Sequence, residues 1–362
     1  MDYKIISTQE EFYNIKKEWE LMELKDSTIS YYSTFHFNYT WWETNKVNTN
    51  LKLFIVCVYH NNSLVGIAPL MLERMKKKIF HYWKLSFLGR GDSLNFIINR
   101  EQGNEGKILK EIFSGIEQNS DSWEKLELTH ISEESVLFWH LMKNGKYNKY
   151  TQFLVQNPNI KLKDFESFDE FKKNNVPAKT NKFVNKLKKE VGYTFEVINN
   201  KYDRNIFKEI VEIHQLEQEF LNQEKGRAER ESLFDDPKKK EFLHQLFKSN
   251  ENILTFVLYS NEGDIITYNT CYKFHDKLHF WNTGYHPKYV NYNLSKVRMY
   301  EIINYLFDNK LQYTIDWGAG GYPWKFEWTN TYLTTYSLSM WNPNNKKAQY
   351  INKIAKIKKK LI

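Results

Sequence analysis

The chain has 362 residues and a formal net charge of +8 at pH 7, with 41% hydrophobic and 17% aromatic residues. This composition excludes a largely disordered, collagen-like or low-complexity protein, because it supplies enough apolar surface for a sizeable core. No apolar run reaches the roughly 18 residues that a membrane-spanning helix needs, and the first twenty residues lack the apolar stretch of a secretion signal. These two absences predict a cytoplasmic protein. The length predicts two domains or one large domain.

The positive charge allows two interpretations. A Lys-rich solvated surface is the simpler one; the other is an anionic partner, such as a phosphorylated cofactor, a nucleotide sugar, nucleic acid or an anionic membrane. Nucleic acid is the least favoured of these, because the sequence contains no zinc finger, RNA-recognition core or repeat code. Cys57 and Cys271 lie far apart in apolar runs. Their spacing excludes a disulfide framework and a zinc ribbon, and it predicts buried thiols in a reducing compartment.

The apolar pattern predicts an α/β fold with mixed sheets. In the first half, the expected elements are helices over 9–24 and 104–118 and strands over 51–59, 64–72, 84–89 and 123–128. In the second half, they are helices over 167–190, 206–220, 238–247 and 294–308 and strands over 195–198, 253–259, 265–274, 277–285, 312–317 and 332–340.

In both halves a hairpin is followed by a strand, a helix and a further strand. This repeated order predicts a divergent internal duplication. We expect two similar domains, 1–160 and 161–342, and a basic tail or helix over 343–362. In the tail, apolar residues alternate with lysines as in a membrane-surface helix, although a solvated terminal helix is the simpler interpretation.

The junction between the strand at 277–285 and the helix from 294 is the first candidate site. A strand-to-helix entry exposes free backbone N–H groups at the positive end of the helix dipole, which favours phosphate. Asn293 or Ser295 is a plausible N-cap, and Lys296 adds a cation in the first turn. An ordinary capped helix is the alternative. The fingerprints of P-loop and Rossmann sites, GxxxxGK[ST] and GxGxxG, are absent.

The second candidate site is the glycine-rich segment 316–325. Asp316 ends a strand, three glycines let the backbone approach a ligand, and Tyr322, Trp324 and Lys325 supply a phenol, a ring and a cation. A glycine-rich turn packed on the core is the alternative. In the first half, Asp92 follows a strand and is a candidate to face a cleft, with a plain loop as the simpler interpretation. The scattered histidines and the missing GxSxG elbow argue against a metal site and a serine hydrolase.

Several segments together resemble the CelD-like (BioF2-like) branch of the GNAT acyltransferases, which are relatives of the FemAB proteins. The resemblance covers most of the chain. Its segments are the aromatic Phe35–Trp42, the hairpin Leu53–Leu72, Leu88-Gly89 with its Asp-containing loop, Ser232–Pro237, Gly284–Tyr289 and Tyr322–Trp328.

The resemblance implies two GNAT-type domains, the second of them active, and acyl transfer from acyl-CoA to an amine, often for cell-surface polysaccharide. An amino sugar, nucleotide- or lipid-linked, is the expected acceptor. The chain departs from the family before the phosphate-site helix, where Tyr292-Asn293-Leu294-Ser295-Lys296 stands in place of a glycine. Two alternatives remain open: a non-catalytic module that binds a glycan or lipid carrier, and a FemAB-like transferase that depends on aminoacyl-tRNA.

Within this chemistry, roles can be assigned to residues of the second half. Asp316 is the first candidate for the base that deprotonates the amine, and Tyr322 or Tyr285 for the donor of a proton to the leaving thiolate. A strand N–H between Thr283 and Tyr285 is the candidate oxyanion donor. The remaining predicted contacts are with the cofactor (Thr283, Gly284, Asn293, Leu294, Ser295, Lys296) and the substrate (Asp92, Trp281, Trp317, Trp324, Lys325).

Overall fold

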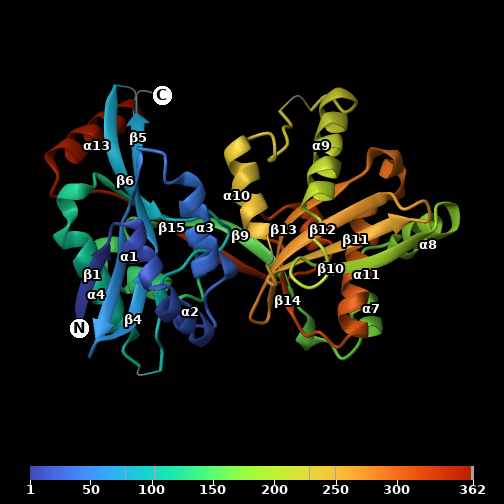
Figure 1. Cartoon of the computed structure of the whole chain (residues 1–362), viewed down its shortest axis with the longest axis horizontal. Coiled ribbons are helices and arrows are strands. Elements are labelled where there is room, and N and C mark those ends of the chain that lie inside the picture. Colours follow the sequence, from blue (N-terminus) through green and yellow to red (C-terminus); the bar gives the residue numbers. More distant parts are fainter. Residues whose placement is uncertain (78, 102, 228, 249, 360–362) are drawn as a thin grey trace. The chain divides into compact units, whose positions relative to one another are not determined.

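The computed structural model describes residues 1–77, 79–101, 103–227, 229–248 and 250–359, and for 355–359 it describes the backbone alone. The chain forms two compact units (Figure 1). Unit 1 comprises residues 1–156 and 333–362, and unit 2 comprises residues 157–332. Each unit combines β-sheet, including one pair of parallel strands, with covering helices, so the expected α/β fold class is confirmed.

Unit 1 contains both ends of the chain. Its helices are α1 (Gln9–Asn14), α2 (Lys16–Lys25), α3 (Phe35–Asn45), α4 (Glu105–Gln118), α5 (Val136–Lys143), α6 (Gly145–Asn148) and α13 (Lys346–Lys359). Its strands are β1 (Asp2–Ile6), β2 (Leu51–Leu53), β3 (Ile55–His60), β4 (Ser63–Ala68), β5 (Leu70–Lys77), β6 (Phe80–Phe87), β7 (Ile97–Ile98), β8 (Lys125–Ser132), β15 (Tyr332–Trp341) and the first part of β9 (Thr151–Lys161).

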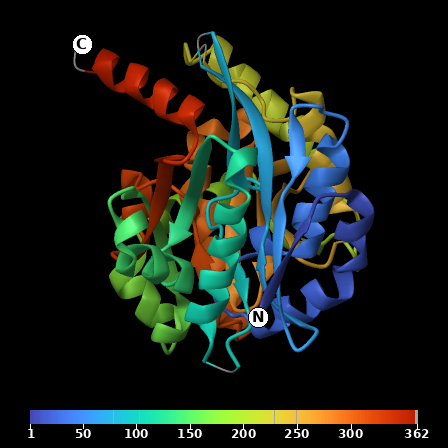
Figure 2. The same cartoon turned by 90° about the vertical axis from the view of Figure 1, so that its left-hand side faces the viewer.

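The strands of unit 1 form two sheets. One has the order β1-β3-β4-β7, and the other contains β9, β15, β8, β6, β5 and β2 in that order. The two expected hairpin strands each divide between these sheets, at Phe54 and at Pro69. Pro69 has no N–H to donate, so it suits the point where the chain changes sheet. Figure 2 shows α4 in teal and α1 to α3 in blue on either side of the β1, β3 and β4 strands.

Unit 2 has the elements that position the candidate site. Its helices are α7 (Phe168–Asn175), α8 (Thr180–Glu190), α9 (Phe207–Gln223), α10 (Pro237–Phe247), α11 (Leu294–Asp308) and α12 (Pro323–Phe326), with a 3₁₀ helix η4 (Pro287–Tyr292). Its strands are β10 (Tyr193–Asn199), β11 (Ile253–Ser260), β12 (Ile265–Phe274), β13 (Lys277–Tyr285), β14 (Thr314–Asp316) and the last part of β9.

The strands of unit 2 lie in the order β10-β11-β12-β13-β14-β9. All neighbouring pairs are antiparallel except β13 and β14, which are parallel and are connected through α11. Figure 1 shows α9 and α10 on one side of these strands and α7 and α11 on the other. The core between the sheet and α11 contains Phe171, Phe256, Leu278, Ile302 and Trp317.

The units share a strand plan that agrees with an internal duplication. In unit 1, β1-β3-β4 is antiparallel, and β6 is parallel to β8 after the helix α4. In unit 2, β10-β11-β12 is antiparallel, and β13 is parallel to β14 after α11. Long-range pairing explains the strands that the sequence pattern missed, since β1 is placed by its register with β3.

The division of the chain differs from the expected one at its end. The last strand, expected in the second domain, lies beside β8 in unit 1, with Leu338 opposite Leu128. Strand β9 contributes residues 151–156 to unit 1 and 157–161 to unit 2. Strands that complete a sheet far from their own sequence neighbours carry no local signal of that pairing, so a boundary drawn from the order of elements misses them.

Some expected helices are interrupted. The helix expected over 9–24 divides at Ile15, and the one over 167–190 divides between α7 and α8, where Pro177 stands. The expected tail is the helix α13, which packs on unit 1 through the buried Ala348 and Ile351. Residues 360–362, the end of the expected tail, lie outside the described residues.

Both thiols are buried, as the sequence predicts, Cys57 in β3 and Cys271 in β12. Burial raises the pKa of both thiols, so they stay protonated and unreactive. Among the described residues, no helix combines the length and the apolar character that crossing a membrane requires.

Candidate functional site

The open edge of β13 is the central feature of the site. The parallel pairing of β13 with β14 covers only three residues and ends where His279 lies opposite Asp316. Strand β13 continues for six more residues to Tyr285, while β14 ends at Asp316. The strands therefore separate, and the last part of β13 has a neighbour, β12, on one edge only. Such a gap between parallel strands, at their carboxyl ends, is a natural ligand site in an α/β fold.

A β-bulge bends strand β13 near its carboxyl end. Thr270 pairs with Asn282 and Cys271 with Phe280, which leaves Trp281 as the extra residue. Bulges bend a strand and redirect its side chains near functional sites. The Trp281 ring lies 5.6 Å from Tyr272 and 6.1 Å from Phe247, centroid to centroid. Trp281 thus packs toward α10, and its predicted substrate contact stays a prediction.

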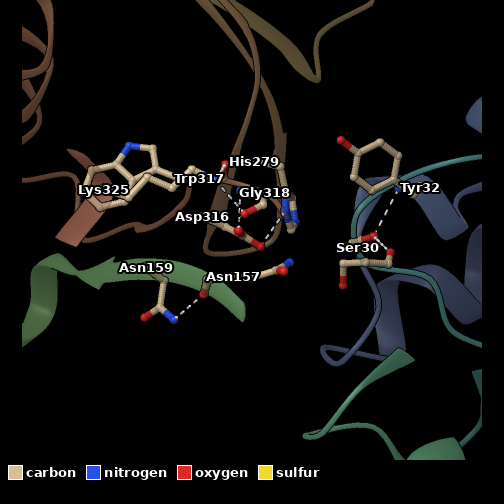
Figure 3. Close-up of polar contacts among 10 residues, drawn as sticks. Ser30, Tyr32, Asn157, Asn159, His279, Asp316, Trp317, Gly318 and Lys325 are labelled. Carbon is tan, nitrogen blue, oxygen red and sulfur yellow. Dashed lines mark hydrogen bonds and ion pairs between the residues drawn. The ribbon is translucent and has the colours of Figure 1, made fainter. Parts of the chain in front are cut away.

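A buried histidine and carboxylate connect β13 to β14 where the gap begins. His279 Nδ1 lies 3.1 Å from Asp316 Oδ2, and the Gly318 N–H donates to Asp316 Oδ1 at 2.8 Å (Figure 3). The pKa of Asp316 is lowered: burial opposes the shift, but the hydrogen bond and charge of His279 and the Gly318 N–H outweigh it. The carboxylate that the sequence nominates as a base is thereby ionised, buried and engaged by two donors.

Lys325 holds the glycine-rich loop after β14 through hydrogen bonds to the loop's backbone. Its Nζ is buried and donates to the carbonyl oxygens of Trp317, Gly318 and Ala319 at 2.8, 3.0 and 3.2 Å. Gly318 and Gly320 have φ values of +69° and +112°, which disfavour other residues. The loop is therefore a fixed structure, and the predicted contact of Lys325 with substrate stays a prediction.

The aromatic residues of this loop divide by exposure. Trp317 is buried in the core, whereas Tyr322 and Trp324 are 58% and 47% exposed. The Trp317 and Trp324 rings meet edge to face at 6.2 Å. The two exposed rings are thus available to a ligand, and the burial of Trp317 supports the alternative that it packs on the core.

The amino end of α11 keeps its first backbone donors open. Asn293 adopts a left-handed conformation with φ of 53°, and its side chain does not cap the helix. The N–H groups of Lys296 and Val297 donate to the Asn293 carbonyl, and those of Leu294 and Ser295 precede them in the first turn. Lys296 forms an ion pair with Glu327 at 2.5 Å. The predicted phosphate-site residues therefore do come together, with the cation already paired.

A group of polar residues that the sequence pattern does not indicate surrounds the open edge of β13. Glu217 comes from α9, Arg298 from α11, Tyr268 from β12 and Asn282 from β13. The Tyr268 hydroxyl donates to Asn282 Oδ1 at 2.5 Å, and Arg298 donates to Thr267 Oγ1 at 2.7 Å. The helical spacing of Glu217 with buried Ile210 and His214 is the one signal that could have revealed it.

Burial shifts the charges in this group. Burial raises the pKa of Glu217 to about 7, although the Arg298 charge and a hydrogen bond from the Tyr285 N–H act in the opposite direction. Burial lowers the pKa of Arg298 to about 10, against the attraction of Glu217. A carboxyl group with a pKa near neutrality is a common feature of functional sites.

A polar cavity of about 580 Å³ lies between α9 and the segment that connects α9 to α10. It is lined by carboxamides, charged groups and a hydroxyl: Gln215, Gln218, Asn222, Gln223, Glu219, Glu231, Asp235, Arg230 and Ser232. Ser232 Oγ also forms a hydrogen bond with Nδ1 of the buried His214, at 2.9 Å. This size and lining suit a small hydroxylated ligand.

The remaining predicted residue, Asp92, belongs to unit 1. Its charge acts on His130, whose pKa is lowered mainly by burial. Within the part of the chain that the structure describes, no three His, Cys, Asp or Glu side chains gather as a metal site would require.

Comparisons with known proteins agree with this geometry. Residues 175–326 match the family "Acetyltransferase (GNAT) domain". That match spans α8 to α12, and so includes β13, β14 and α11. The search of curated proteins found no significant match.

Solved structures resemble the chain over nearly its whole length. FemX has a TM-score of 0.60 at 10% identity, with 94% of this chain and 98% of FemX covered. L-PGS from Bacillus licheniformis has a TM-score of 0.54 at 13% identity, with 92% and 94% covered. The C-terminal domain of a putative lysylphosphatidylglycerol synthetase from Agrobacterium fabrum has 0.53 at 10% identity, with 94% and 95% covered.

At these identities the structural likeness establishes the fold, and the family match establishes the domain. Residues 175–326 therefore form a GNAT acetyltransferase domain, and the chain as a whole shares the fold of FemX and of L-PGS.

Proposed function

We propose that this protein is an N-acyltransferase that moves an acyl group from acyl-CoA to the amine of an amino sugar, nucleotide- or lipid-linked, in cell-surface polysaccharide biosynthesis. The observation that carries the proposal is the open edge of β13 beside the uncapped amino end of α11. One feature offers backbone donors to a thioester carbonyl, and the other offers them to phosphate.

The donor is expected to bind with its phosphates at α11. The Leu294 and Ser295 N–H groups and the positive end of the helix dipole favour an anion there. Lys296 would exchange Glu327 for a phosphate, because its ion pair is partly exposed and therefore weak. Asn293 supplies a left-handed turn before the helix, a conformation that glycine adopts readily and asparagine tolerates.

The thioester carbonyl is expected at the open edge of β13. In an antiparallel pair, every second residue directs its N–H away from the neighbouring strand. Thr283, opposite Asn269, and Tyr285, opposite Thr267, are both such residues of β13, so the Thr283 N–H is directed away from β12. That N–H is our candidate oxyanion donor. Burial raises the pKa of Tyr285, so its hydroxyl stays protonated at neutral pH and suits the role of proton donor to the leaving thiolate. The exposed Tyr322 is the alternative donor.

The cavity beside α9 is our candidate for the acceptor. Carboxamides such as Gln218 and Asn222 can exchange hydrogen bonds with sugar hydroxyls, and the exposed Arg230 can pair with the phosphate of a nucleotide- or lipid-linked sugar. We further propose that the exposed lysines of α13 contact an anionic membrane. Ile351 is buried against unit 1, so such a contact would rely on charge.

A second candidate function is aminoacyl transfer from aminoacyl-tRNA. It is favoured by the whole-length likeness to FemX, to L-PGS and to the domain of a putative lysylphosphatidylglycerol synthetase. The two candidates predict different donors. Binding of tRNA would weaken steeply with added salt, because the contacts would be largely with phosphates.

Calorimetric titration with acetyl-CoA and longer acyl-CoA thioesters tests the proposal. We expect binding, and we expect Lys296→Gln to weaken the affinity about tenfold. This is the loss of affinity expected when one hydrogen bond to a charged group is removed. Lys240→Gln, on the exposed face of α10, removes the same charge elsewhere and should leave binding unchanged.

Three results would contradict parts of the proposal. If no thioester binds while tRNA binds with a steep salt dependence, the acyl-CoA donor is wrong and the second candidate holds. If both lysine variants bind like the wild type, the donor phosphates do not lie at Lys296. If acyl-CoA binds and no amino sugar is acylated, the acceptor class is wrong.

A further inference from the structure

Glu217 places a carboxyl group at the open edge of β13. The His286 N–H donates to the Ile266 carbonyl at 2.9 Å, which makes His286 and Ile266 a hydrogen-bonded pair. In an antiparallel ladder the next pair, Tyr285 and Thr267, then directs its backbone groups outward. The Tyr285 N–H therefore points away from β12, and Glu217 accepts a hydrogen bond from it. The carboxyl group thus lies on the edge from which β14 has separated.

The surroundings of Glu217 leave buried hydrogen-bonding capacity unused. Its Oε2 atom is buried and has no hydrogen-bond partner among the described residues, and the same holds for Nε of Arg298. Arg298 is only 7% exposed. Buried polar atoms are ordinarily paired, so two such atoms at one strand end indicate a polar group that is supplied by a ligand.

Residue 284 has no room for a side chain larger than that of glycine. A Cβ atom added to Gly284 would lie 2.7 Å from the Tyr268 ring and 3.2 Å from Glu217 Oε2. The strand therefore needs glycine here for the carboxyl group to reach its edge. This gives a physical reason for Gly284 that is separate from its predicted contact with the cofactor.

We propose that Glu217 receives the proton of the acceptor amine during acyl transfer. This proposal rests on the proposed function. The nitrogen forms a bond to the thioester carbon, the carbon–sulfur bond breaks, and CoA leaves as its thiolate. The proton of the ammonium form passes to the Glu217 carboxylate before attack. The second proton, which the nitrogen loses after attack, reaches the thiolate through a hydroxyl such as that of Tyr285, which gives its own proton to the sulfur and takes up the one from the nitrogen.

The charges that face Glu217 support this role. Arg298 from α11 and Arg230 from the segment after α9 favour its ionised form, and the hydroxyls of Tyr268 and Tyr285 stay protonated beside it. Burial outweighs the two cations and brings its pKa to about 7. Glu217 is thus better matched to accept a proton at neutral pH than Asp316, whose pKa is lowered and whose two oxygens already accept hydrogen bonds.

The test compares two kinds of acceptor, ammonium and neutral, in one assay. Release of CoA from acetyl-CoA is followed with glucosamine 1-phosphate and ethanolamine, which are ammonium ions at neutral pH, and with hydroxylamine, which is already neutral. We expect Glu217→Gln to lower kcat/KM for the ammonium acceptors by at least a hundredfold and for hydroxylamine far less. Its affinity for acetyl-CoA should be unchanged, and the rise of the wild-type rate around pH 7 should disappear.

Glu212→Gln, on the exposed side of α9, is the matched control and should behave like the wild type. Equal losses with both kinds of acceptor would show that Glu217 only supports the structure, and no loss would show that it takes no part; either result overturns the inference. If glucosamine 1-phosphate is inert while ethanolamine reacts, the amino-sugar proposal fails and ethanolamine still decides the role of Glu217. If acetyl-CoA does not bind to the wild type, the acyl-CoA reaction fails, and the role of Glu217 with it.

Discussion

At the scale of single residues, the buried carboxyl group of Glu23 makes the stability of the fold depend on pH. Glu23, in α2, is 8% exposed and accepts a hydrogen bond from the Phe35 N–H at the start of α3. Burial raises its pKa from 4.5 to about 8, with repulsion from Glu20 acting in the same direction. Between these two pH values the folded protein holds a proton that the unfolded chain has lost. Its contribution to stability is therefore present below pH 4.5 and is lost as the pH rises toward 8.

We expect Glu23→Gln to remove this loss of stability. The amide is neutral at every pH, and its oxygen can still accept from the Phe35 N–H. Thermal unfolding followed by circular dichroism should give a Tm above that of the wild type at pH 9 and close to it at pH 5. Glu134→Gln, at an exposed residue of unit 1, is the control. Equal Tm values for Glu23→Gln and the wild type at pH 9 would show that Glu23 is ionised in the fold without cost.

At the scale of elements, the contact between β13 and β14 decides where the site opens. Three backbone pairs hold the strands together. His279 and Asp316 form the last of these pairs, and their side chains also form a hydrogen bond. Beyond this point the bulge at Trp281 turns β13, and the loop held by Lys325 turns the chain away from β14. The histidine–carboxylate pair therefore fixes the closed end of the gap in which the thioester is expected.

We expect Asp316→Asn to lower the free energy of unfolding by about 2 kcal/mol at pH 7, the usual cost of losing a hydrogen bond to a buried carboxylate. The lowered pKa of Asp316 means that its stabilisation is present above the unfolded value of 3.8 and is lost as the pH falls through the folded one. Urea titrations should therefore show a difference that narrows at low pH. Asp308→Asn, at the exposed end of α11, should be nearly neutral. A similar loss in both variants would mean that the pair does not hold the strands.

At the scale of the whole molecule, the net charge of +8 includes the lysines of α13. The described part of α13 carries exposed Lys346 and Lys353, while Lys347 pairs with the largely buried Glu124. The apolar residues of this helix that the structure describes are used in part within the fold, since Ala348 and Ile351 are buried. Attraction to an anionic surface is then the remaining way in which this helix can reach a membrane.

We expect the protein to sediment with vesicles that contain anionic phospholipid and not with neutral vesicles. Each lysine near the surface contributes about 1 kcal/mol, and salt screens the attraction. The double variant Lys346→Glu/Lys353→Glu should lose binding, while Lys238→Glu/Lys240→Glu, on α10, should keep it. Binding to neutral vesicles would contradict an electrostatic contact.

The sequence by itself was sufficient for the fold class, the repeated order of elements and the bounds of the long strands and helices around the site. Strands β12 and β13 and helix α11 were placed to the residue, because strong apolar periodicity and polar turns are local signals. The position of the helix entry at Asn293 and of the glycine-rich loop also follows from short segments of sequence, whereas the predicted side-chain cap by Asn293 is absent.

Only the tertiary structure decided which residues meet. The pairing of β15 with β8 moved the end of the chain into unit 1, and the short pairing of β13 with β14 opened the site. The dyad of His279 and Asp316 and the approach of Glu217 to Tyr285 join residues 37 and 68 positions apart in sequence. A single sequence records the identity of such residues but not their distances, because those depend on strand register and on burial, which belong to the packed chain as a whole.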